Sequence, residues 1–315
     1  MSTTVQRTVP PSDKPVTRPG DRIFAGLSTA SGVLILSTLF GVAAFLLWQA
    51  WPAITADPSE VRGGQGLVWY IGPLVFGTLV AAVIALIIAF PLSVGIALFI
   101  SHYAPRRLAA ALGYIVDLLA AVPSVVFGLW GISVIGPMML GIQAWSVDNL
   151  RFLPFIGGPA SPKSMLVTGT VLAIMILPIM TAVNREVFLQ TPRLHEEASL
   201  ALGATKWEMI QQAVIPFGRS GVISGAMLGL GRALGETMAV AIILSVSARY
   251  TAVITSPANP GTIAADIALQ FPESRQGPQL ATLVASGLVL FLVTLIVNMT
   301  ARWIISRRAE FSGAN

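Results

Sequence analysis

The amino-acid sequence predicts an all-α integral membrane protein with six transmembrane helices. Of its 315 residues, 55% are hydrophobic and only 10% are charged, and the mean hydropathy is +0.79. Soluble domains carry about 25% charged residues. Five long tracts contain no Asp, Glu, Lys or Arg, and a sixth contains only two such residues. Each tract is longer than the roughly 20 apolar residues that are needed to cross a bilayer. The tracts are residues 23–56, 63–105, 118–147, 164–184, 220–248 and 276–301.

These tracts set the expected order of elements and the domain organisation. Residues 1–22 are rich in Pro, Thr and Ser without apolar periodicity, which predicts a disordered cytoplasmic tail. Residues 23–70 then hold the first span and an outer loop, residues 71–305 the main membrane domain, and residues 306–315 a second cytoplasmic tail. The expected spans lie near residues 24–48, 71–100, 109–135, 165–188, 220–248 and 279–303.

Basic residues predict the orientation of these spans. With both termini in the cytoplasm, 13 of the 19 Lys and Arg residues fall in cytoplasmic segments, five fall in outer segments, and Arg232 lies in a span. Cytoplasmic loops of membrane proteins carry this excess of Lys and Arg. The net charge of +5 therefore indicates topology and contact with anionic lipid, and it does not suggest nucleic acid.

Several kinds of chemistry lack the residues they need. The chain has no cysteine, which excludes disulfides and thiolate metal sites, and its two histidines, His102 and His195, fall in predicted cytoplasmic loops. We expect no metal site. No G-x-x-x-x-G-K-[ST] phosphate-binding loop occurs either. We therefore expect no cofactor in this chain, so that any ATP and Mg²⁺ would be bound by a partner subunit.

A water-compatible helical element interrupts the apolar chain at residues 191–216. Thr191 is a plausible N-cap with Pro192 at the first helical position. Gly203 is placed to end that helix in a left-handed C-cap. Thr205 and Glu208, three residues apart, form a capping-box pattern that starts a second helix.

The second helix of this element is predicted to be short and amphipathic. Trp207, Ile210 and Val214 recur at helical spacing, and Pro216 follows them. Three interpretations compete for the pair of helices. It could lie in the membrane interface, read DNA as a helix-turn-helix, or form a docking surface for a soluble partner.

The spacing of this element resembles a known family. Permeases of type I ABC importers carry EAA, three residues, Gly, nine residues and then I-x-L-P before their penultimate span. This chain has EAS at 197–199, Gly203 and AVIP at 213–216, with all spacings kept. In that family the element is the coupling helix that fits a groove on an ATPase. The resemblance assigns ATPase coupling to Glu197, Ala198, Gly203, Trp207 and Pro216.

More of the chain, roughly residues 70–305, resembles the phosphate-uptake (PstC-type) branch of that family. The stretches that carry the likeness are LLAAVPSVVFGLWG at 118–131 and GRSGVISGAMLGLGRALGETMAV at 218–240. The resemblance implies the type I permease fold with a type-1 transmembrane domain and transport of inorganic phosphate across the bacterial cytoplasmic membrane. It also implies four partners: a second permease, two ATP-binding subunits and an extracytoplasmic binding protein.

Arg232 and Glu236 are the charges predicted to lie inside the fifth span. A charge at that depth costs at least ~2.5–3.5 kcal/mol, and a spacing of four predicts an intrahelical ion pair. On a helical wheel they share one face with Gly221, Gly225 and Gly229, so that face is expected to meet protein or a water-filled path. The pair could fix helix register. Alternatively, Arg232 could offer a guanidinium to an anion in transit, with Glu236 holding it in place.

Asp117, in the predicted third span, is the weakest candidate for the substrate pathway, because a carboxylate bonded near the inner interface explains it as well.

Two alternatives to phosphate import by an ABC importer remain open: a different oxyanion as substrate, and a different class of transporter. Sulfate, molybdate or another oxyanion would satisfy the same physics as phosphate. An ion-coupled secondary transporter could also use Arg232 and Glu236, although no inverted repeat is visible. An intramembrane hydrolase lacks a catalytic constellation.

Overall fold

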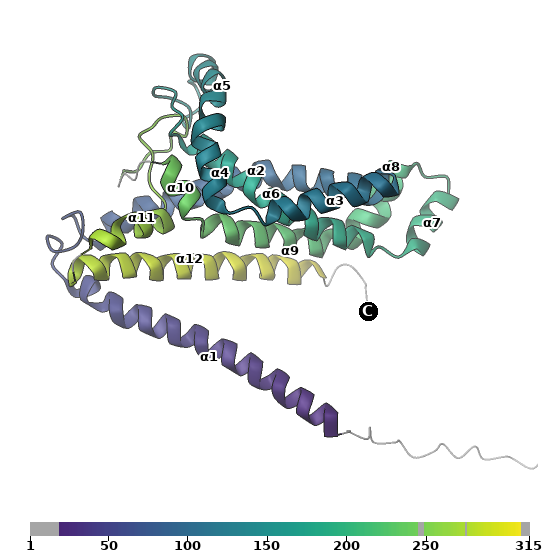
Figure 1. The fold of residues 1–315 in the computed structure, drawn as a ribbon, viewed down its shortest axis with the longest axis horizontal. Helices are drawn as coiled ribbons and strands as arrows, with labels where there is room; N and C mark the ends of the chain where they lie inside the picture. The colour runs from purple at the N-terminus through teal and green to yellow at the C-terminus, as the bar shows by residue number, and fades with distance from the viewer. Residues whose placement is uncertain (1–18, 245–248, 275, 310–315) are drawn as a thin grey trace, which may run out of the picture. The chain divides into compact units, whose positions relative to one another are not determined.

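The computed structural model describes residues 19–244, 249–274 and 276–309, and every regular element in these ranges is a helix (Figure 1). Six helical segments there are long and apolar enough to cross a membrane. This confirms the all-α fold with six spans. The segments are Pro19–Thr55, Leu67–Tyr103, Ser124–Asn149, Met165–Leu189, Lys206–Leu234 and Pro278–Trp303.

The chain divides into two compact units, Met1–Trp48 and Gln49–Asn315. Helix α1 (Pro19–Thr55) begins at a proline, whose fixed φ suits the first turn of a helix. Residues 1–18 of the predicted tail lie outside the described residues, and the last four residues of that tail, 19–22, are helical. Side chains of residues 19–42 are all exposed, as expected of a helix that meets lipid.

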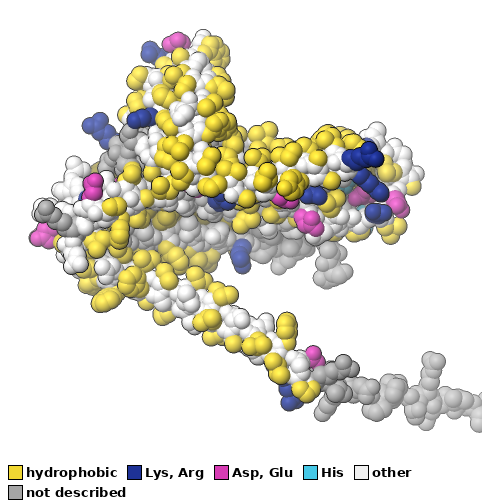
Figure 2. All heavy atoms as spheres, in the orientation of Figure 1, with side chains coloured by type: hydrophobic (Ala, Val, Ile, Leu, Met, Phe, Trp, Pro, Cys, Tyr) yellow, Lys and Arg dark blue, Asp and Glu magenta, His cyan; other side chains and the backbone are white. Residues whose placement is uncertain are grey.

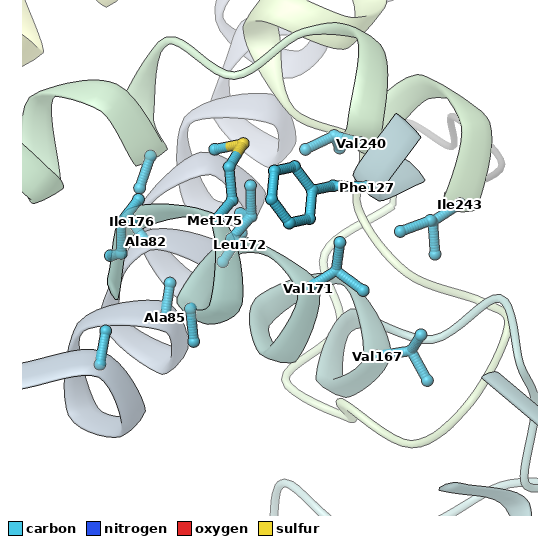
Figure 3. Packing of buried hydrophobic residues seen from close by; sticks show 14 of the residues in the cluster. Ala82, Ala85, Phe127, Val167, Val171, Leu172, Met175, Ile176, Val240 and Ile243 are labelled. Carbon is cyan, nitrogen blue, oxygen red and sulfur yellow. The ribbon is translucent and has the colours of Figure 1, made fainter. Parts of the chain in front are cut away.

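Helix α6 (Met165–Leu189) is the centre of the second unit, and α2 (Leu67–Leu98) packs along it. The facing side of α2 is built from alanines, which let the two backbones approach closely. The core between them continues to Phe127 and Val240 (Figure 3). The α2 alanines in this core are Ala81, Ala82, Ala85 and Ala89, and each is at most 1% exposed.

Helix α9 (Ile215–Leu234) also packs against α6, through glycines, and it contacts α2 as well. A Cβ added at Gly221 would lie 2.4 Å from Val187, and one at Gly229 would lie 2.7 Å from Met180. Gly225 is similarly close to Asn184. The prediction that this stripe faces protein is confirmed, and its partner is α6.

The predicted third span, 109–135, is wrong in its position. Residues 106–120 form a separate helix, α3 (Arg106–Ala120), and the span Ser124–Asn149 follows as α4 (Ser124–Trp130), a π-helical turn and α5 (Gly136–Asn149). Pro123 has an extended ψ of 139° at the start of α4. The residue before a proline is disfavoured in the helical region, and here the backbone is extended at Pro123, so the helix breaks at this point.

The predicted fifth span, 220–248, is also misplaced. The spanning helix runs from Lys206 to Leu234 and then breaks before the short helix α10 (Met238–Ile243), while residues 245–248 lie outside the described residues. Glu236 sits in the break and accepts the Ala239 backbone N–H through Oε1 at 3.1 Å. A carboxylate at the beginning of a helix stabilises its free N–H groups, so Glu236 favours a new helix over continuation of α9.

Three π-helical turns share one sequence context. They are η1 (Phe99–Tyr103), η2 (Gly131–Ile135) and η3 (Ile210–Val214), and a proline follows each after one intervening residue. A proline has no N–H to donate, and its ring clashes with the carbonyl four residues earlier. At Pro137 and Pro216, which lie inside continuing helices, the wider π turn accommodates the proline, whereas Pro105 lies beyond the end of η1 at the extended N-cap of α3.

The remaining helices are α11 (Ile263–Gln270), the 3₁₀ turn η4 (Phe271–Glu273) and α12 (Pro278–Ala309). Thr262 caps α11 by accepting the Ala265 N–H. Helix α12 packs against α9, α11 and α2, and so completes the bundle of the second unit.

The substitution Gly225→Ala tests the packing of α9 on α6. The new Cβ would lie 2.8 Å from Oδ1 of Asn184, a fully buried side chain that donates to Ser93. Overpacking of this kind costs about 1–3 kcal/mol, so the melting temperature of the detergent-purified protein should fall. Gly231→Ala on the same helix, where a Cβ meets nothing within 4 Å, should not lower it. Equal melting temperatures for the two variants would contradict this packing.

Candidate functional site

The first candidate site is the element at 191–216, which consists of α7 (Arg193–Ala201), α8 (Lys206–Met209) and η3. Gly203 has a φ of +89°, and the N–H of Ala204 donates to the Ser199 carbonyl at 3.3 Å. A side chain is disfavoured in this left-handed region, and glycine adopts it without strain. The predicted glycine stop between two helices is confirmed.

The start of this element differs from prediction by one residue. Pro192 occupies the N-cap position with an extended ψ of 126°, and the helix begins at Arg193. Thr191 was predicted to be the cap, but it is only 5% exposed and its hydroxyl has no hydrogen-bond partner in the described part of the chain. An extended proline turns the backbone away from Thr191, so its side chain does not reach the first helical N–H groups.

The predicted capping box at the second helix is confirmed. The Glu208 N–H donates to Thr205 Oγ1 at 3.3 Å, and the Thr205 N–H donates to Glu208 Oε2 at 2.7 Å. Two backbone donors at the start of a helix are thus satisfied reciprocally. The turn after Gly203 is therefore defined by local hydrogen bonds, and its geometry does not depend on burial.

The second helix is not short. It continues from α8 through η3 into α9, so the prediction that it ends at Pro216 is wrong. The helix accommodates the proline because η3 widens the turn before it. Ile210 and Val214 are fully buried, whereas Trp207, predicted on the same face, is 51% exposed.

Trp207 belongs instead to an exposed surface on the element, together with Leu194 and Leu202, which are 77% and 91% exposed. Glu197 and Ala198 are exposed on α7 and Pro216 is exposed at the start of α9. Figure 2 shows Lys and Arg side chains gathered at the end of the molecule where α7 and α8 lie. Large apolar side chains beside charges form the kind of surface that binds another protein.

The second candidate site is a groove of about 870 Å³ beside α9. Arg232 lines it from the last turn of α9, and Arg302 and Asn298 line it from α12. Among the described residues that line it there is no Asp or Glu. The remaining lining residues are Ile179, Ser224, Met227, Leu228, Gly231, Leu295 and Met299.

Arg232 and Glu236 do not form the predicted intrahelical ion pair. Helix α9 ends at Leu234, so the two residues do not share a helix, and no ion pair joins them in the described structure. Glu236 is 8% exposed and caps α10, whereas Arg232 is half-buried and borders the groove. The helical-wheel prediction requires one continuous helix through both residues, but the helix ends at Leu234, and Gly235 is its C-cap.

Asp117 belongs to neither site. It lies on α3, outside the membrane-spanning segments, and its side chain is exposed, so its predicted place in the third span is wrong. The sequence had given no reason to single out Arg302 and Asn298. They follow an apolar tract at the end of α12, and only the packing of that helix against α9 brings them beside Arg232.

The sequence comparisons define the class of protein. Residues 89–309 match the family described as binding-protein-dependent transport system inner membrane component, and the chain belongs to this family. It is a permease subunit of an ABC importer, a multi-pass inner membrane protein and a transport component rather than an enzyme. An importer permease works with an ATPase and other partners, which excludes the ion-coupled secondary transporter considered above.

Relatives with similar sequences have a narrower description than the family as a whole. Phosphate transport system permease protein PstC 2 of Mycobacterium tuberculosis is 40% identical over 306 residues, covering 90% of this chain and 91% of that protein. PstC of Mycobacterium leprae is 42% identical, covering 94% and 96%. Among solved structures, a bacterial ABC transporter for alginate import is similar with a TM-score of 0.55 at 15% identity, covering 91% of this chain and 99% of that one. That likeness supports the fold alone.

The capping box gives a test of local structure at the first site. Thr205→Val removes the hydroxyl that accepts the Glu208 N–H, at a cost of about 1 kcal/mol in helix stability. Amide hydrogen exchange at residues 206–208 should therefore accelerate several-fold, measured by mass spectrometry. Thr205→Ser, which retains the acceptor, should exchange like the wild type. Unchanged exchange in the valine variant would show that the box does not stabilise this turn.

Proposed function

We propose that this chain translocates inorganic phosphate across the cytoplasmic membrane in an ATP-driven importer. The relatives named above are phosphate transport permeases at about 40% identity over nearly their whole length. The assembly would contain a second, similar permease, two ATP-binding subunits and an extracytoplasmic phosphate-binding protein. ATP and Mg²⁺ would bind to the ATPase subunits, since this sequence has no phosphate-binding loop. Both termini would lie in the cytoplasm, in keeping with the distribution of Lys and Arg.

The groove beside α9 supports an anion pathway through this chain. Consecutive spans cross the membrane in opposite directions, so Arg232, at the end of α9, and Arg302, near the end of α12, border opposite ends of the groove. A planar guanidinium donates two hydrogen bonds to a tetrahedral oxyanion. Two such groups at different depths, with the polar side chains of Asn298 and Ser224 also in the lining and no carboxylate among the described lining residues, would let an anion step from one to the other.

The transport step requires an energy source. Moving a divalent anion into a cell that is negative inside by 100 mV costs about 4.6 kcal/mol, at ~2.3 kcal/mol per charge. We propose that the ATPase subunits provide this energy through the exposed surface around Trp207 and Gly203. Closure of the ATPases on ATP would draw the elements at 191–216 together and open the permease to the outside. Hydrolysis would then return it inward.

Replacing the groove arginines tests the pathway. Arg232→Gln and Arg302→Gln should each lower phosphate uptake at least tenfold, the effect of losing one charged hydrogen-bonding group worth about 1.5–3 kcal/mol. Uptake of labelled phosphate in cells whose only phosphate importer contains the variant measures the effect. Arg219→Gln, on an exposed position of α9 outside the groove, is the matched control. Normal uptake by Arg232→Gln in an assembled complex would refute the pathway.

Sulfate, molybdate or another oxyanion is the alternative substrate, because each satisfies the same hydrogen-bonding geometry. Comparing labelled phosphate with labelled sulfate uptake, in cells with and without this chain, separates the two. We expect deletion to remove phosphate uptake and leave sulfate uptake intact. Loss of sulfate uptake alone would overturn the substrate assignment and leave the importer assignment standing.

Trp207 tests the docking surface. Its side chain is 51% exposed, so Trp207→Ala should leave the fold intact while removing a large apolar contact. Aromatic anchors contribute about 2 kcal/mol or more to an interface, so we expect at least a tenfold loss in the amount of ATPase that co-purifies. Trp145→Ala, at a 59% exposed position on α5, is the control. If both variants retain the ATPase equally, the docking surface lies elsewhere.

A further inference from the structure

Helix α2 and the turn η1 form one unbroken rod of 37 residues, Leu67–Tyr103. At about 1.5 Å per residue this rod is roughly 55 Å long, far more than the ~30 Å of the hydrocarbon core. Both of its ends therefore project beyond the membrane. In contrast, the spanning helix that starts at Lys206 breaks after Leu234, before it meets α10.

The end of the rod at Tyr103 contacts both halves of the element at 191–216. His102 Nε2 lies 3.4 Å from Oε1 of Glu196 on α7. Nζ of Lys206, on α8, lies 4.8 Å from the centroid of the Tyr103 ring, within cation–π range. The side chains of His102 and Glu196 are 8% and 24% exposed, so water screens this contact less than a surface pair.

A hydrogen bond within η1 orients the His102 ring. Its Nδ1 lies 2.7 Å from Ser101 Oγ, which also lies 2.8 Å from the Ala97 carbonyl oxygen. The serine hydroxyl can donate its single proton to the ring or to that carbonyl. In the first case Nδ1 accepts, so the neutral ring carries its proton on Nε2 and can donate it to Glu196 Oε1. In the second case the Nδ1–H donates to Ser101 Oγ.

Buried apolar side chains join the same parts of the chain beneath these polar contacts. One cluster contains Ala97 and Leu98 of α2 together with Met209, Ile210 and Val214 from the second helix of the element. All five are at most 7% exposed. Close-packed interiors transmit displacement because they have low compressibility. A movement of the element therefore moves the end of α2 with it.

The other end of the rod is attached to α11. The Tyr70 hydroxyl donates to Asp266 Oδ2 at 2.6 Å, and the Ile263 N–H donates to Thr78 Oγ1 at 3.1 Å. Burial raises the pKa of the Asp266 carboxyl above its ordinary value, while the Tyr70 hydroxyl and the Arg62 guanidinium oppose that rise. These side chains are buried or half-buried. These two hydrogen bonds join α11 to the rod at two positions, Tyr70 and Thr78.

We infer that α2 is the strut that carries displacement of the 191–216 element across the membrane to α11, and that His102 and Tyr103 are the positioning residues that grip the element. The inference rests on the proposed docking of the ATPase at that element. Helix α9 is continuous with the element but breaks after Leu234, before α10, whereas α2 does not break. The strut therefore gives the element an uninterrupted helical connection to α11.

The test is the number of ATP molecules hydrolysed per phosphate imported by the whole complex in proteoliposomes with its binding protein. We expect His102→Ala and Tyr103→Leu to raise this ratio at least fivefold, the lower end of typical coupling between sites, while the ATPase still co-purifies. His102→Gln, which keeps a donor, and Tyr103→Phe, which keeps the ring face, should retain the wild-type ratio. A wild-type ratio in both His102→Ala and Tyr103→Leu overturns the inference.

A covalent cross-link in place of the His102–Glu196 contact provides a second measurement. This chain contains no cysteine, so the introduced pair His102→Cys and Glu196→Cys would supply the only thiols of this chain for a short bismaleimide to bridge. We expect the unbridged pair to be uncoupled and bridging to restore the wild-type ratio. Bridging that abolishes import would mean that the two parts separate during transport, which contradicts a strut. If the wild-type complex itself lacks a bound ATPase, the proposed function fails, and the inference fails with it.

Discussion

The close approach of α2 and α9 to α6 is the constraint on which the rest of the second unit depends. Lipid tails are as apolar as leucine, so helices in a membrane gain little by hiding apolar surface and associate through close van der Waals packing of small residues. The alanines of α2 and the glycines of α9 meet α6 at distances where larger side chains do not fit. This packing positions Arg232 beside α12 and brings the end of α2 to the element at 191–216.

Breaks in the helices determine where the membrane spans begin and end. Pro123 ends the run that begins with α3, and Gly235 with Glu236 ends α9, so two spans begin and end at different residues from those that hydropathy alone indicates. At Pro216, in contrast, the helix does not break, because the π turn before it accommodates the proline and the helix continues. As a result, the element for which we propose ATPase docking is a direct extension of a membrane-spanning helix.

The two candidate sites use different physics. The surface around Trp207 is exposed, amphiphilic and shaped by local capping, as a protein docking surface requires. The groove beside α9 gathers two guanidinium groups from separate helices among apolar side chains, without a neighbouring carboxylate in its lining. A buried carboxylate, Glu236, stabilises a helix start close by instead of neutralising Arg232. Arg232 and Glu236 are therefore not paired in the described structure, as the proposed anion pathway requires.

The sequence by itself determined the features that depend on composition and short-range geometry. Six spans follow from the charge-free tracts, and Gly203 with the Thr205–Glu208 box follows from backbone conformation and local hydrogen bonds. Tertiary structure decided which faces meet. The separation of Arg232 from Glu236, the exposure of Trp207 and Asp117, and the place of Arg302 in the groove depend on helix breaks and on packing between distant segments. Hydropathy does not register these effects, because residues with the same hydropathy can face lipid, protein or a groove.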